Sequence, residues 1–331
     1  MTDLDTSRAW LDAERSTLVT VAAHTATHGW PTHTTRLARA LFRYLTEGGH
    51  YTDELTVYGH ALHAARHSSD PTMQAQALTD LGVAHWHLGG HGPAAEHFQQ
   101  ALDLFRQAGD PAGQARALNS LGIVEVRLGR YRTATDHHAQ ALTLFRQTGN
   151  RDGEAYALNG LGQVEVWWGR YGPAAEHLQQ ALTLYRQLGE RGGEAGALDN
   201  LGILHTRLGQ PAQATEHHQQ ALIIVREIGA REGEAWTLNG LGEAAHAAGH
   251  PTDALIHHTA AYAISADIGD RGQQARAHTG LAHAHHALAN TAQARQHYQH
   301  ALTLYTDLGV PQADQISTHL AALDNTNPEQ R

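Results

Sequence analysis

The chain of 331 residues contains no cysteine, which excludes disulfide bridges, a thiolate nucleophile and a cysteine-based zinc site. Lysine is also absent, so arginine supplies all 23 basic residues, and 33 acidic residues outnumber them. The formal charge of −10 argues against a surface for nucleic-acid phosphates, because such surfaces gather positive charge. We therefore expect no direct contact with nucleic acid.

Long apolar runs and nucleotide-binding motifs are missing as well. No segment approaches the roughly 18 apolar residues that a membrane-spanning helix needs, and from the first residues we expect no signal peptide. The phosphate-binding pattern GxxxxGK[ST] does not occur, so nucleotide binding through a P-loop is not expected. These absences predict a soluble, cytoplasmic protein that contacts no membrane and needs no cofactor, and they leave its oligomeric state open.

What the sequence does contain is a repeat with a period of 40 residues. Two alanine positions and one glycine position keep the same phase along the chain, as Ala134, Ala141 and Gly149 do within one unit. The most visible marker is a Leu-Gly pair, which stands at Leu81-Gly82, Leu121-Gly122, Leu161-Gly162, Leu201-Gly202 and Leu241-Gly242. A fixed period of this length is typical of stacked repeat proteins.

One repeat predicts two helices. Apolar residues at three- and four-residue intervals indicate a buried stripe on a helix over residues 112–128, and a second stripe follows over residues 134–147. The Gly129–Tyr131 turn separates the two helices, and Gly149 suits the left-handed residue that ends a helix. A single helical hairpin cannot cover its own apolar face, so the hairpins are expected to stack into an all-α solenoid.

The repeat resembles the tetratricopeptide repeat, in which Leu-Gly is followed by alanines at fixed distances, as at Leu121-Gly122, Ala134 and Ala141. The period of 40 instead of the usual 34, and Glu125 or Glu165 in place of a core tyrosine, depart from the family pattern. Longer hairpins of this kind are similar to kinesin light chains and to the C-terminal arrays of actinobacterial STAND (NB-ARC-type) transcriptional regulators.

The resemblance implies a right-handed superhelix of about seven hairpins with a capping helix at each end. We expect an N-terminal cap over residues 1–32, a repeat array over residues 33–310, and a C-terminal cap and tail over residues 311–331. The repeats are expected to start near residues 33, 71, 111, 151, 191, 231 and 271.

In this family the first helix of each hairpin lines a concave groove, so the resemblance implies that polar residues beside the buried stripe face a ligand. One such line is rich in side-chain amides, which both donate and accept hydrogen bonds and can therefore hold the backbone of an extended peptide. Its members are Thr79, Asn119, Asn159, Asp199, Asn239 and Thr279. The alternative is that these residues serve the packing of neighbouring helices or persist as copies of a duplicated unit.

Irregular positions near this line are expected to select the ligand, because aromatic and arginine residues dominate recognition. The predicted groove residues other than the amide line are Arg116, Arg127, Tyr156, Gln163, Trp167, Arg207, Trp236 and Glu243. Trp168, by contrast, takes the place of a leucine in other repeats and is expected in the core.

The 28 histidines raise the question of a metal, but we expect no metal site. Adjacent histidines on a helix point about 100° apart, so the doublets His137-His138, His217-His218 and His257-His258 cannot chelate one ion. No HExxH motif accompanies the remaining histidines. A solvated or stacking role is therefore expected for the histidines, and inter-repeat ion pairs with arginine are expected for Glu125 and Glu165.

The sequence as a whole predicts a non-catalytic module that captures a peptide or protein segment, with a place as the sensor or scaffold part of a bacterial regulator. The alternative is an enzyme that uses Glu243, His246, His283 or His286 as acid and base in a groove pocket. No set of nucleophile, base and orienting group can be assembled from the spacing, so no catalytic residue is assigned.

Overall fold

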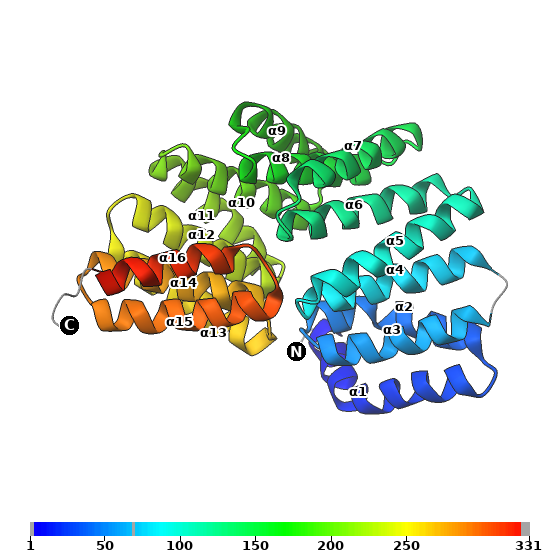
Figure 1. Cartoon of the computed structure of the whole chain (residues 1–331). Coiled ribbons are helices and arrows are strands. Elements are labelled where there is room, and N and C mark those ends of the chain that lie inside the picture. The colour runs from blue at the N-terminus through cyan, green and yellow to red at the C-terminus, as the bar shows by residue number, and fades with distance from the viewer. Residues whose placement is uncertain (1–2, 68–69, 326–331) are drawn as a thin grey trace. The chain divides into compact units, whose positions relative to one another are not determined.

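The computed structural model describes residues 3–67 and 70–325, and within these ranges the chain forms sixteen α-helices and no strand (Figure 1). None of these helices combines the length and apolar character that crossing a membrane requires. The first eight are α1 (Asp3–Thr27), α2 (Pro31–Glu47), α3 (Tyr51–Arg66), α4 (Pro71–His87), α5 (His91–Ala108), α6 (Pro111–Arg127), α7 (Tyr131–Gln147) and α8 (Arg151–Trp167). The others are α9 (Tyr171–Leu188), α10 (Arg191–Arg207), α11 (Pro211–Glu227), α12 (Arg231–Ala247), α13 (Pro251–Ile268), α14 (Arg271–Ala287), α15 (Thr291–Leu308) and α16 (Gln312–Asn325).

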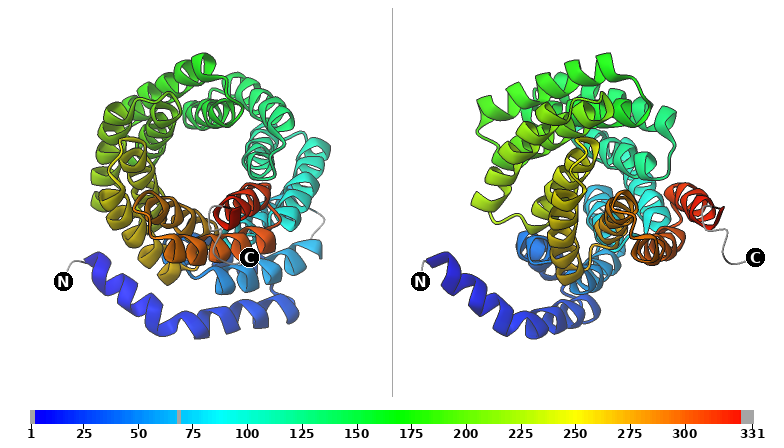
Figure 2. Two further views of the ribbon diagram at one scale, coloured as in Figure 1. Left: turned by 60° about the vertical axis from the view of Figure 1, so that its left-hand side comes forward. Right: turned by 90° about the vertical axis from the view of Figure 1, so that its left-hand side faces the viewer.

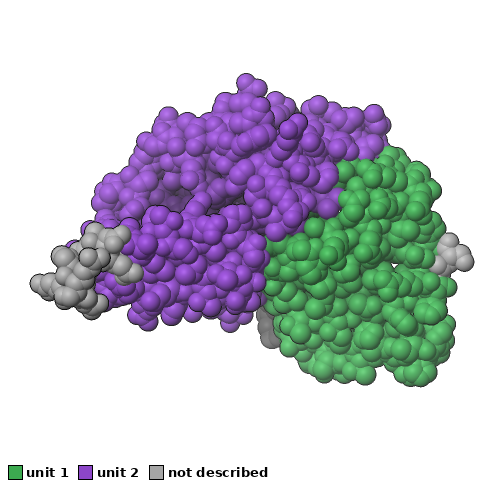
Figure 3. Space-filling view, in the orientation of Figure 1, with its two compact units in different colours: residues 1–120 green, residues 121–331 purple. Residues whose placement is uncertain are grey.

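The chain divides into two compact units, unit 1 over residues 1–120 and unit 2 over residues 121–331, with the boundary inside α6 (Figure 3). In unit 1, α4 and α5 pack as a hairpin, and α1 packs against both α2 and α3. In unit 2, hairpins form from α8 with α9, α10 with α11, α12 with α13, and α14 with α15. The predicted all-α solenoid of helical hairpins is confirmed.

Unit 2 is a curved row of hairpins (Figure 2). The first helices of successive hairpins stack on each other, α8 on α10, α10 on α12, and α12 on α14. Alanines at the repeat positions let the helices approach closely, and Ala134, Ala141 and their counterparts in unit 2 have no exposed surface. The helix that follows the last hairpin, α16, packs on α15.

A left-handed residue ends every helix of the repeats in unit 2. Glycine takes this conformation at each such turn except one, where Ala289 has φ = 60°. Glycine adopts positive φ without a steric cost, whereas a residue with a Cβ loses roughly 1–2 kcal/mol. Strain of this kind is accepted in the last hairpin, in keeping with the atypical sequence of terminal repeats.

Three buried histidines form part of the core of unit 2, which corrects the expectation of a solvated or stacking role for them. The side chains of His138, His218 and His258 are 0% exposed. Each imidazole ring fills a slot between glycines of two successive first helices. A methyl group added to either glycine would come within 2.7 Å of the ring, and the pairs are Gly122 with Gly160, Gly202 with Gly240, and Gly242 with Gly280.

Candidate functional site

Polar partners from the predicted amide line hold two of the buried histidines, His218 and His258. His258 Nδ1 donates to Asn239 Oδ1 at 2.9 Å, and His218 Nδ1 donates to Asp199 Oδ1 at 2.7 Å. Asn239 Nδ2 in turn donates to the backbone oxygen of Gln273 at 3.2 Å and to its Oε1 at 3.1 Å. Nearly the whole hydrogen-bonding capacity of the Asn239 amide is therefore used inside the protein.

The expectation that Asn239 presents its amide to a ligand is wrong, because its side chain is 0% exposed. Asp199 and Asn119 are also buried, with 7% and 5% of their surface exposed. Asp199 and Asn239 instead support the packing of neighbouring helices, which was the alternative interpretation of the amide line. Asn119 lies in unit 1 and is not part of the site in unit 2.

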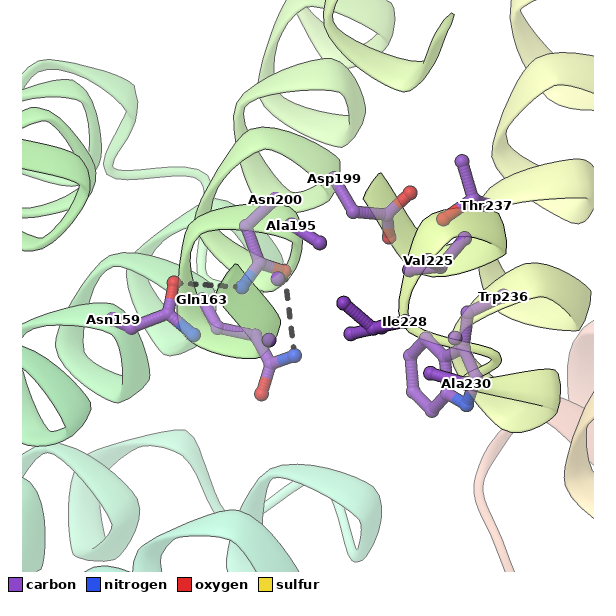
Figure 4. Close-up of a pocket in the computed structure, with 13 residues that line it drawn as sticks. Asn159, Gln163, Ala195, Asp199, Asn200, Val225, Ile228, Ala230, Trp236 and Thr237 are labelled. Carbon is purple, nitrogen blue, oxygen red and sulfur yellow. Dashed lines mark hydrogen bonds between the residues drawn. The ribbon is translucent and has the colours of Figure 1, made fainter. Parts of the chain in front are cut away.

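Asn159 is different because its repeat carries Leu178 at the position that holds the buried His138, His218 and His258 in three other repeats. Its Oδ1 accepts a hydrogen bond from Asn200 Nδ2 at 3.1 Å, and Asn200 Oδ1 accepts one from Gln163 Nε2 at 3.4 Å (Figure 4). Within the described residues, this amide triad of Asn159, Asn200 and Gln163 leaves Asn159 Nδ2 and Gln163 Oε1 without a protein partner. Both Asn159 and Gln163 are partly exposed beside a cavity.

An arginine–tryptophan contact identifies the face on which the triad lies. The Arg127 guanidinium lies 4.2 Å from the centroid of the Trp236 ring, although α12 comes three hairpins after α6. Residues so far apart along a curved array meet only on the inner side of the curve. Trp236 lines the same cavity as Asn159 and Gln163, so we call this side the inner face of unit 2.

A partly exposed ion pair lies next to Trp236. Arg276 Nε and Nη2 donate to the two carboxylate oxygens of Glu243 at 2.6 and 2.9 Å, and the Arg276 guanidinium lies 5.8 Å from the Trp236 ring. Burial by itself raises the pKa of Glu243, but Arg276 outweighs it and lowers that pKa to about 2. Burial also lowers the pKa of Arg127 to about 10. Trp236 therefore lies against two arginine side chains that hold it in place.

The other predicted aromatic residues of unit 2 lie in partly or fully exposed positions. The Arg207 guanidinium lies 5.0 Å from the centroid of the half-buried Trp167, and Tyr156 is 51% exposed. The core position expected for Trp168 is wrong, because 42% of its surface is exposed and Arg170 stacks on it. In unit 1, Arg116 lies 5.7 Å from the Phe105 ring and donates to Gln76 Oε1 at 3.5 Å.

The predicted ion pairs of the two core glutamates take a different form. Glu125 pairs with Arg130 at 3.3 Å in the turn of its own hairpin, rather than with an arginine of another repeat. Glu165 accepts from His177 Nδ1 at 2.8 Å, and this hydrogen bond raises the pKa of His177. Both pairs connect parts of one hairpin, so they stabilise the repeat and not the contact between repeats.

The residues of the acid–base alternative do not form a poised pair. Glu243 is engaged by Arg276, and a pKa near 2 makes it a weak base at neutral pH. The rings of His246 and His283 lie 5.7 Å apart, and burial lowers the pKa of His283 to about 4. His286 is exposed. Within residues 3–67 and 70–325 no group of three or more metal-ligating side chains is placed to hold an ion.

Sequence reasoning missed Asn200 and the histidine anchors. The signal for both was present: His138, His218 and His258 stand 19 residues after Asn119, Asp199 and Asn239, while Leu178 stands 19 residues after Asn159. One of the two glycines that flank each histidine lies on the next first helix, and beside Leu178 the corresponding position is Asn200. Comparing each residue of the amide line with the residue 19 positions later distinguishes Asn159 from Asp199 and Asn239, whose side chains serve the core.

A solenoid of helical hairpins with a polar inner face defines a helical-repeat protein. Models of the tetratricopeptide repeat match residues 113–187, 193–267 and 275–307. These segments together span more than half of the chain, which belongs to the tetratricopeptide repeat family. A comparison with curated protein sequences finds no match.

Solved structures with this fold include a Rap protein complexed with competence and sporulation factor, with a TM-score of 0.61 and 14% identity over 96% of this chain and 99% of that one. The Rap conjugation gene regulator of plasmid pLS20, in complex with the Phr* peptide, has a TM-score of 0.70 and 14% identity over 83% of this chain and 74% of that one. A STAND protein with a tetratricopeptide repeat sensor from Pyrococcus horikoshii has a TM-score of 0.55 and 14% sequence identity. That match covers 93% of this chain and 46% of the STAND protein. At these identities the likeness shows a shared fold.

Proposed function

We propose that the inner face of unit 2 binds a peptide or protein segment in an extended conformation. The observation that carries the proposal is the open end of the amide triad, where Asn159 Nδ2 can donate and Gln163 Oε1 can accept. A peptide unit offers the matching acceptor and donor in its C=O and N–H groups. The hydrogen bonds of Asn200 to both neighbours fix the two side chains, so little side-chain entropy is lost on binding.

Two relatives of the same fold were solved with a bound factor or peptide, which supports capture over catalysis. The role that fits best is the sensor or scaffold part of a regulator, as in the STAND protein whose repeats are described as its sensor. Predicted groove residues outside the triad, Trp236 and Arg207 among them, supply aromatic and cationic contacts around the segment.

The test is a selection of 12-residue peptides displayed on phage against the intact protein, followed by calorimetric titration of the best synthetic peptide. The double variant Asn159→Ala/Gln163→Ala should bind that peptide roughly thirty-fold more weakly, because two hydrogen bonds of about 1 kcal/mol each are lost. Its thermal unfolding should stay close to that of the wild type, since both side chains are partly exposed.

The matched control is Gln140→Ala/Gln180→Ala, which removes two amides from exposed positions on the second helices α7 and α9. This control should retain full affinity. Equal affinity of the triad variant and the wild type would refute the proposed role of the amides, and an equal loss in both variants would refute its location on the inner face.

A further inference from the structure

A cavity of about 230 Å³ lies beside the amide triad, between α8, α10, α11 and α12 (Figure 4). The triad forms one side, and the side chains of Val225, Ile228 and Trp236 face it from the other. Asp199 lies at one end, where its Oδ1 accepts from His218. The wall opposite the amides is therefore mainly apolar, whereas the amides can fix a backbone beside it.

The cavity exists because one repeat has a glycine, Gly196, at a position where the neighbouring repeats carry large side chains. The repeat places Tyr156, Gly196, Trp236 and Arg276 at the same position of successive first helices. Around Gly196 the space is open, since a Cβ added there would meet only Asn159 Nδ2, at 4.0 Å. Gly196 thus differs from Gly240 and Gly280, whose missing side chains make room for a histidine ring of the protein itself.

Resting on the proposed peptide binding, we infer that this cavity is a pocket for an aromatic side chain of the bound peptide. A cavity of about 150 Å³ lined by apolar groups holds benzene, so 230 Å³ accommodates a phenylalanine ring. Trp236 offers its ring to such a side chain and is held in place by Arg127 and Arg276. The Asp199 carboxylate repels an acidic side chain.

The probes are N-acetyl-phenylalanine N-methylamide and its alanine and glutamate counterparts, which carry one residue between two peptide units. Titrations followed by NMR should show that the phenylalanine probe binds at least ten-fold more tightly than the other two, because burying its ring removes apolar surface from water. The phenylalanine probe should shift the Val225 methyl and Trp236 indole signals. Signals of Ile223 and Ile256, which are 59% and 62% exposed, should not move.

Gly196→Trp fills the pocket with the side chain that the next repeat carries at Trp236. It should abolish the preference for phenylalanine over alanine, whereas Gly196→Ala should retain it. If either variant loses its helical circular dichroism, the test of the pocket is made on the wild-type protein alone. There the phenylalanine probe must shift the NMR signals of Val225 and Trp236. An unchanged preference in a folded Gly196→Trp variant, or shifts at Ile223 and Ile256 alone, would overturn the pocket.

The two proposals fail in different ways. If all three probes bind equally and weaken together in Asn159→Ala/Gln163→Ala, the pocket is refuted and peptide binding stands. If the triad variant binds the phage-selected peptide as the wild type does, the proposed function is refuted. A phenylalanine preference without a contribution from the triad would also contradict the pocket as described here, since the amides hold the backbone of the residue that enters it.

Discussion

We expect acidification from pH 7 to pH 4 to unfold unit 2. Burial lowers the pKa of His138 and of His258 to about 3, from an ordinary value of 6.5. Between these values the unfolded chain binds protons that the folded chain cannot, so stability falls as the pH falls below 6.5. Each histidine then costs about 3 kcal/mol by pH 4, so the two together are comparable with the whole stability of a typical domain.

Other groups reinforce this direction, whereas His177 opposes it. Burial also lowers the pKa of His278 and of His283, each to about 4, so both also reduce the stability of the folded state as the pH falls below 6.5. The carboxylate of Glu243, with its pKa near 2, adds its loss only below pH 4.5. His177 acts in the other sense, because its raised pKa gives stability that is present below pH 6.5 and is lost as the pH rises.

The measurement is helical circular dichroism against pH at low protein concentration, since solubility falls near the isoelectric point of about 6.2. His258→Leu copies the natural Leu178 repeat and removes one titrating group, so the acid transition should move to lower pH. His250→Gln changes an exposed histidine and should leave it in place. A transition that is unaffected by His258→Leu would contradict the assignment to the buried histidines.

Replacing Gly242 and Gly280 by alanine together lowers the free energy of unfolding by about 2–3 kcal/mol, although alanine is the better helix former. The two added Cβ atoms would lie 2.5 and 2.1 Å from His258 Nε2. The ring is 0% exposed and tied to Asn239, so it cannot move aside without losing that hydrogen bond. Overpacking of this kind outweighs a helix-propensity gain of roughly 1 kcal/mol per site.

Chemical denaturation measures this effect, and two further variants make it specific. Gly196→Ala adds a Cβ in open space and should stabilise the protein by up to about 1 kcal/mol. In a His258→Ala background the slot is vacant, so the two glycine substitutions should change from destabilising to neutral or stabilising. The same loss in both backgrounds would mean that His258 is not what the glycines accommodate.

The hairpin fold could be predicted because period and side-chain size act on it directly. The Leu-Gly and alanine positions of the repeat at Leu121-Gly122, Ala134 and Ala141 are all buried, and Gly149 has the left-handed φ expected for it. The family resemblance therefore rested on residues that form the core. The boundaries predicted for the repeat array and for the two capping regions stay predictions.

The candidate site was harder to predict because Asn159 and Asn239 share one register. Register places both on the same side of a first helix but does not tell what lies opposite. A histidine at 258 draws Asn239 into the core, whereas Leu178 offers Asn159 no polar partner, so its amide turns to Asn200. The ion pair of Arg276 with Glu243 joins two neighbouring first helices. The spacing of residues along one helix does not tell how close side chains of different repeats come, so this pair could not be predicted.

The inner-face account is tested most directly by a crystal structure of the protein with the peptide selected on phage. We expect a peptide C=O within hydrogen-bonding distance of Asn159 Nδ2, an N–H directed at Gln163 Oε1, and an aromatic side chain beside Trp236. A peptide bound on the outer helices α9, α11 or α13, with the amide triad still open to solvent, would contradict it.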